Sequence, residues 1–156
     1  MTSPVERLTG LGLKLPEVAA PLAAYVPAVR TGPYVYTSGQ VPLADGRLLA
    51  TGKVGAEVTV EQAKHLARTC ALNALAAAAS VCGGLSAIRR VVKVTGFVAS
   101  APSFTGQALV VNGASELFLE VFGDAGKHAR SAVGMAVLPL DAPVEVELIV
   151  EVAAEE

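Results

Sequence analysis

The chain has 156 residues, of which 53% are hydrophobic and 17% charged, and its formal net charge is −2 at pH 7. This length suits one domain, and the apolar excess favours a buried subunit interface over a lone monomer, although the many alanines also inflate the apolar count. The slight excess of acidic over basic residues, without a run of Lys or Arg, argues against a nucleic-acid-binding protein. No apolar stretch is long enough to span a bilayer.

The first predicted helix follows Ser3, because Ser3-Pro4-Val5-Glu6 has the spacing of a capping box with proline at the first helical position. Two short strands are predicted over residues 25–29 and 34–38, on either side of the turn Thr31-Gly32-Pro33. We interpret 1–156 as a single domain, with an N-terminal extension over 1–24 and a core over 25–152.

A second capping box, Thr59-Val60-Glu61-Gln62, opens a long helix that Gly83-Gly84 is predicted to end. Residues 89–99 are rich in β-branched side chains and predict a strand. A second long helix follows, marked by an apolar stripe with Gly123 at its C-terminal end; the stripe comprises Ala114, Leu117, Phe118, Val121 and Phe122.

Strands over 131–138 and 144–152 complete the chain. In the last strand the valines alternate with Glu145, Glu147, Ile149 and Glu151, so the two sets lie on opposite faces. The order of elements predicts an α+β fold, with one mixed sheet and two main helices on one of its faces. The other face then needs solvent or a partner, and Ile149 among the glutamates favours a partner.

The remaining reactive side chains give little sign of chemistry. Cys70 and Cys82 lie in one predicted helix, about 18 Å apart, so we interpret them as buried apolar residues and not as a disulfide. We expect His65 to be exposed, whereas His128 could line a site or simply be solvated. No residues have the spacing of a metal site, and residues 1–15 lack the apolar core of a signal peptide, so a cytoplasmic location follows by default.

Several segments resemble, in order, the motifs of one protein family. They are residues 32–42, containing Thr37-Ser38-Gly39-Gln40; Phe97-Val98; Val111-Asn112 with Leu117-Phe118; and residues 129–139 followed by Val144-Glu145-Val146-Glu147. Together they identify the chain as similar to the reactive intermediate deaminase (RidA/YjgF) family, some of whose members are labelled endoribonuclease L-PSP. The extended N-terminus and residues 111–115 and 126–130 resemble a less-studied subgroup.

The resemblance implies a chorismate-mutase-like fold that assembles as a homotrimer, with sheets facing inward and a cleft at each subunit interface. It also implies hydrolysis of reactive 2-imino or 2-enamino acids, such as 2-aminoacrylate, to 2-keto acids and ammonia, as in 2-iminobutanoate/2-iminopropanoate deaminases. No cofactor and no metal is implied. The expected ligand is a small imino acid, enamino acid or other carboxylate, and neither nucleic acid nor a membrane is expected as a partner.

The family's catalytic residues fall on Arg130, which would bind the substrate carboxylate, and Glu145, which would hold the attacking water. Each has an alternative: Arg130 could form an ion pair with a glutamate of the last strand, and Glu147 could take the place of Glu145. Further pocket positions fall on Tyr25, Ser38, Gly39, Asn112 and Ala132.

Ala132 departs from the family, because well-studied deaminases often have Cys or Thr at this position. The departure keeps open a second function, a binding module that holds a small carboxylate in the same pocket without turnover. A third function, RNA cleavage or inhibition of translation, is disfavoured by the acidic balance and by the 4% aromatic content.

Overall fold

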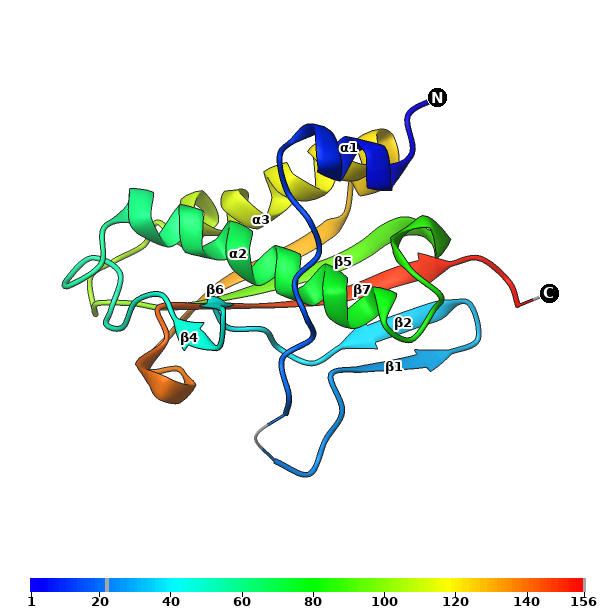
Figure 1. Ribbon diagram of the computed structural model, residues 1–156. Coiled ribbons are helices and arrows are strands. Elements are labelled where there is room, and N and C mark those ends of the chain that lie inside the picture. Colours follow the sequence, from blue (N-terminus) through cyan, green and yellow to red (C-terminus); the bar gives the residue numbers. More distant parts are fainter. Residues whose placement is uncertain (22, 156) are drawn as a thin grey trace.

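A computed structural model describes residues 1–21 and 23–155. Its centre is a mixed five-stranded sheet in the order β1-β2-β7-β5-β6, in which β5 and β6 are parallel and the other neighbours antiparallel. The strands are β1 (Ala28–Thr31), β2 (Tyr34–Thr37), β5 (Ile88–Ala99), β6 (Ala129–Met135) and β7 (Val144–Val152), and a small hairpin contains β3 (Leu43–Ala44) and β4 (Arg47–Leu48). Helices α2 (Val60–Ala79) and α3 (Gln107–Phe122) cover one face of the sheet (Figure 1), which confirms the predicted α+β fold.

Both predicted capping boxes are formed. In helix α1 (Pro4–Gly10), Ser3 Oγ accepts from the Glu6 backbone N–H at 3.2 Å and Glu6 Oε2 accepts from the Ser3 N–H at 2.7 Å. Thr59 and Gln62 exchange the equivalent bonds at the start of α2. Each box satisfies backbone donors that a helix leaves unpaired at its first turn, so the sequence alone locates the helix start.

Several predicted ends were wrong by a few residues. Helix α2 ends at Ala79, and Gly83 and Gly84, at φ 93° and 116°, shape the turn before the short 3-10 helix η1 (Leu85–Ala87). The first strand begins at Ala28, since Pro27 has no N–H for a ladder, and Tyr25 therefore precedes the sheet. Strand β6 ends at Met135, before the 3-10 turn η3 (Pro139–Asp141).

The core lies between the helices and the sheet. In β7, alternate residues from Val144 to Val152 are buried against the helices, and Glu145, Glu147, Ile149 and Glu151 lie half-buried on the open face, as predicted. Tyr34 and Tyr36 of β2 are exposed. The open face is therefore neither fully polar nor covered by another element of the chain.

Gly113 of α3 lies at the crossing of the two long helices. A Cβ built on Gly113 would lie 1.9 Å from the carbonyl oxygen of Lys64 in α2. Only a residue without a side chain permits this approach. The distance between α2 and α3 in turn affects how α3 is positioned over the sheet.

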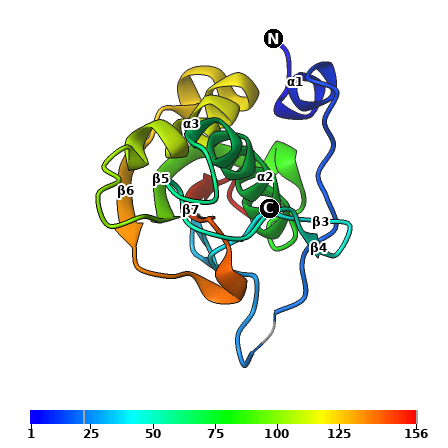
Figure 2. The ribbon, with the colours of Figure 1, turned by 90° about the vertical axis from the view of Figure 1, so that its left-hand side faces the viewer.

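The first fifteen residues of the chain lie against the helix layer. Helix α1 packs on α3 and buries Leu8, while Leu13 and Leu15 pack against the core. Figure 2 shows α1 on the same side of the sheet as α2 and α3. Among the described residues, no helix has both the length and the apolar character that crossing a membrane requires.

Candidate functional site

Arg130 lies on β6, an edge strand of the sheet, and its side chain contacts helix α3. Its Nη1 donates to Asn112 Oδ1 at 2.8 Å and to Ser115 Oγ at 3.1 Å, and its Nη2 contacts the Ala108 carbonyl oxygen at 3.4 Å. The structure thus brings Arg130 and Asn112 together. In the described part of the chain no ion pair joins Arg130 to a carboxylate, so the alternative of an ion pair with β7 is not formed.

The contacts of Arg130 use three of the five N–H groups of the guanidinium. Among the described residues no acceptor bonds to Nε–H, and one Nη2–H is likewise left over. A guanidinium with two N–H groups to spare can bind a planar carboxylate with two parallel hydrogen bonds.

Ser115 and His128 complete this group of residues, which we call the arginine cluster: Arg130, Asn112, Ser115 and His128. Ser115 Oγ lies 2.8 Å from His128 Nε2, and His128 Nδ1 lies 2.6 Å from the Gly126 carbonyl oxygen. Sequence reasoning missed Ser115. Its spacing of three residues from Asn112 places both on one helix face and could have revealed it.

Glu145 lies on the open face of the sheet, beside Gly39. A Cβ on Gly39 would lie 1.9 Å from Glu145 Oε1, so the carboxylate occupies the space that only a glycine leaves open. Burial, and then the neighbouring carboxylate of Glu147, raise the pKa of Glu145. A carboxylate with a raised pKa accepts a proton more readily than an exposed one, which suits a group that orients or activates water.

Ser38 and Tyr25 lie on the same side of the molecule as Gly39. The Ser38 hydroxyl donates to the Val26 carbonyl at 2.6 Å, and Tyr25 and Gly39 line a small cavity of about 60 Å³. Gly39 therefore lies against Glu145 and shares a cavity with Tyr25, and Ser38 precedes it in the chain. We call Tyr25, Ser38, Gly39 and Glu145 the glutamate cluster.

The two clusters lie on opposite faces of the sheet. Arg130 is in register with Val94 of β5 and Glu145 with Phe97, with β5 between β6 and β7. Arg130 contacts α3, whereas Glu145 points to the open face. One chain therefore does not bring Arg130 and Glu145 together. Ala132 lies on β6 in register with Gly96, two residues beyond Arg130 and so on the same face.

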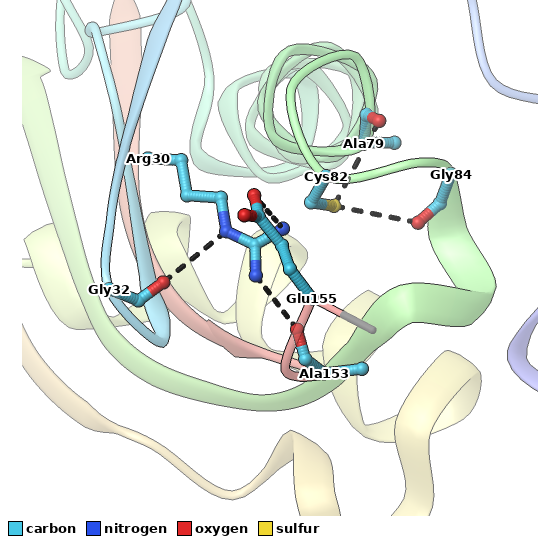
Figure 3. A network of polar contacts seen from close by, with 7 residues as sticks. All are labelled: Arg30, Gly32, Ala79, Cys82, Gly84, Ala153 and Glu155. Atoms are coloured by element: carbon cyan, nitrogen blue, oxygen red, sulfur yellow. Dashed lines mark hydrogen bonds and ion pairs between the residues drawn. The ribbon is translucent and has the colours of Figure 1, made fainter.

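A second arginine, Arg30, lies near the opposite edge of the sheet and binds the C-terminal segment (Figure 3). Its Nη2 donates to the Ala153 carbonyl at 2.9 Å, its Nε lies 3.3 Å from the Gly32 carbonyl oxygen, and its Nη1 lies 3.4 Å from Glu155 Oε1. Arg30 also lines a cavity of about 740 Å³ with Glu151 and Glu155. Because these carboxylates repel anions, this cavity is a poorer carboxylate site than the arginine cluster.

Cys70 and Cys82 are free, and burial raises the pKa of both thiols. His65 is exposed on α2, as predicted. Within residues 1–21 and 23–155, no three His, Cys, Asp or Glu side chains are grouped so as to hold a metal ion.

Glu145→Gln is expected to raise the free energy of unfolding at neutral pH. A carboxyl whose pKa is higher in the folded than in the unfolded chain loses stability as the pH rises from its ordinary value of 4.5 through the raised value. Glutamine keeps the shape beside Gly39 and removes the charge. Urea denaturation from pH 4 to pH 8 measures the difference, which should vanish at the acidic end.

The matched control is Glu17→Gln, which makes the same charge change at an exposed position. A Glu145→Gln variant that is no more stable than wild type at neutral pH, with a flat difference across the titration, would contradict the raised pKa.

The chain is similar to known proteins in both sequence and fold. A family model described as "YjgF/chorismate_mutase-like, putative endoribonuclease" matches residues 5–152. Protein TCP17 from Trypanosoma cruzi is 48% identical over 145 residues, which cover 92% of this chain and 91% of that protein.

Two solved structures extend the comparison. One, described as "a putative endoribonuclease from Shewanella oneidensis MR-1", has a TM-score of 0.93 and 39% identity, covering 96% of this chain and 99% of that one. E. coli TdcF with bound serine has a TM-score of 0.65 and 25% identity, covering 88% of this chain and 94% of that one.

Proposed function

The chain belongs to the YjgF family, also called the RidA family, and from this membership we propose that it hydrolyses reactive 2-imino or 2-enamino acids to 2-keto acids and ammonia. In this reaction an enamine first tautomerises to the imine. Water then adds to the imine carbon, and the carbon–nitrogen bond of the resulting carbinolamine breaks to release ammonia.

The observation that carries the proposal is the anchoring of Arg130. Three acceptors on α3 fix the guanidinium and leave two N–H groups for a substrate carboxylate. A fixed arginine loses less conformational entropy on binding than a mobile one, so the arrangement favours recognition of a planar anion. The serine bound to TdcF, a relative in fold and sequence, supports a small amino-acid-like ligand for this family.

Glu145 is the proposed water-holding residue. It lies beside Gly39, whereas Glu147 lies further along β7, against Lys93 and Thr95. We favour Glu145 over Glu147 because the Glu145 carboxylate lies directly against Gly39, the residue that also lines a cavity with Tyr25 and follows Ser38 in the chain. Its carboxylate accepts a proton from the attacking water and returns one to the leaving nitrogen.

The proposed site needs more than one chain. Since Arg130 and Glu145 lie on opposite faces of one sheet, a cleft that uses both requires a second copy, which supports the homotrimer with inter-subunit clefts. The exposed Tyr34 and Tyr36, beside half-buried Ile149 on the open face, supply apolar area for such a contact.

A binding module without turnover is the second candidate, and Ala132 favours it. The alanine supplies no polar side chain two residues after Arg130, so residue 132 can contact substrate or water only through its backbone. RNA cleavage is the least supported function, since the net charge of −2 gives no attraction for phosphates.

Release of ammonia and keto acid from 2-aminoacrylate generated in situ tests the proposal. We expect the wild-type protein to exceed the spontaneous rate severalfold, because bound substrate and water are held in position. A folded wild-type protein that gives only the spontaneous rate yet binds pyruvate would support the binding module. Salt-sensitive retention of RNA, without either result, would support the nucleic-acid function.

A further inference from the structure

Three separate groups contact His128, one at each ring nitrogen and one at the ring itself. Nδ1 lies 2.6 Å from the Gly126 carbonyl oxygen, and Nε2 lies 2.8 Å from Ser115 Oγ. The ring stands at 88° to the ring of Phe118, with 5.8 Å between their centroids. Gly126 itself is confined, because a Cβ there would lie 2.2 Å from the Phe118 carbonyl oxygen.

These contacts select one tautomer of the neutral ring. A carbonyl oxygen can only accept, so Nδ1 carries the hydrogen and Nε2 presents its lone pair to Ser115. The Ser115 hydroxyl then donates to Nε2. Its oxygen lone pairs are left to accept from Arg130 Nη1 at 3.1 Å.

Without an acceptor at Nε2, the Ser115 hydroxyl has another partner within its own helix. A serine inside a helix can donate to the carbonyl of the preceding turn, and that rotation moves its lone pairs. The geometry of the hydrogen bond from Arg130 Nη1 to Ser115 Oγ therefore depends on His128.

We propose that His128 is a positioning residue, which acts through Ser115 to fix the plane of the Arg130 guanidinium. The inference rests on the proposed role of Arg130 as the carboxylate anchor. His128 does not bind substrate. It keeps the guanidinium of Arg130 in one orientation, so that the two unpaired N–H groups are fixed before the carboxylate arrives.

A serine beside a histidine also has the geometry of an activated nucleophile. That role does not suit Ser115, because Arg130 already bonds to its oxygen, and because the surrounding N–H groups belong to the interior of α3 and are used within the helix. The donors that remain near Ser115 are the two unpaired N–H groups of Arg130, and the proposed function assigns these to the substrate carboxylate and not to an oxyanion on Ser115.

Two substitutions separate positioning from packing. His128→Leu removes the acceptor and keeps apolar contact with Phe118, whereas the amide oxygen of His128→Gln can still accept from Ser115. We expect KM for 2-aminoacrylate to rise about three- to tenfold in the leucine variant, as one net hydrogen bond allows, with kcat within about twofold. The glutamine variant should recover most of the loss.

His65→Gln is the matched control, since His65 is the other of the two histidines and is exposed on α2. It should leave both constants at wild-type values. A fall in kcat at unchanged KM in His128→Leu would place His128 in the chemistry, and equal loss in the leucine and glutamine variants would make its role structural. Either result overturns the proposal.

A readout without turnover keeps this inference separate from the proposed function. The Nε–H signal of Arg130 in nitrogen-15 NMR spectra reports the mobility of its guanidinium with no ligand present, and pyruvate titration reports carboxylate affinity. Restricted motion of the Arg130 Nε in wild type and His128→Gln, with clearly greater motion in His128→Leu, supports positioning even if no deamination occurs. An Arg130 signal that is identical in all three proteins refutes it.

Discussion

Arg130→Ala is expected to lower kcat/KM for 2-aminoacrylate by about thirtyfold or more, because it removes both donors of the proposed carboxylate fork. Charge-assisted bidentate hydrogen bonds are among the strongest polar contacts, and truncating one partner of such a pair costs about 2–5 kcal/mol. Steady-state kinetics of ammonia release and calorimetric titration with pyruvate measure the loss.

Two further variants sharpen this test. Arg130→Lys keeps the charge but not the planar fork, so its kcat/KM should fall between those of wild type and alanine. Arg89→Ala makes the same charge change at an exposed position on β5 and should change kcat/KM by no more than about twofold. A folded Arg130→Ala protein that keeps wild-type kcat/KM would remove Arg130 from the site.

Gly113→Ala is expected to destabilise the fold by about 2–3 kcal/mol, the cost of overpacking a tight contact. The new Cβ would meet the Lys64 carbonyl oxygen at 1.9 Å, and a backbone atom of a helix cannot turn aside as a side chain can. The two long helices must separate. Since Asn112 and Ser115 flank Gly113, the separation should also raise KM. Denaturation at fixed protein concentration measures the stability.

The control for this substitution is Gly10→Ala. Gly10 ends helix α1, and a Cβ added to it would meet no other atom within 4 Å, so alanine there should be neutral or slightly stabilising. If Gly113→Ala unfolds at the same denaturant concentration as wild type, the helix crossing must be looser than the structure has it.

Local features of the sequence predicted local features of the fold. Ser3 and Thr59 mark the starts of α1 and α2 because a capping box is formed within four residues. The alternation in β7 predicted which side chains are buried for a similar reason: successive strand residues point to opposite faces whatever lies beyond them.

Features that depend on distant parts of the chain were not predictable in this way. The parallel pairing of β5 with β6 fixes Arg130 on the helix side of the sheet, and no pattern within either strand encodes that register. Ser115 escaped notice because a helical serine has no distinctive chemistry until Arg130 and His128 fold against it. The family motifs identified Arg130 and Glu145 as candidate site residues, but not that their side chains lie on opposite faces of the sheet.

The separation of the two clusters by the sheet also bears on how such proteins diverge. Under the proposed roles, ligand recognition depends on residues of α3 and β6, whereas the water-holding carboxylate depends on β7 and the Gly39 turn. Mutation can therefore remove turnover at Glu145 without altering the surface that recognises the carboxylate. Evolution could in this way derive a metabolite sensor from a catalyst by changing one strand face, while the sensor inherits the ligand preference of its ancestor.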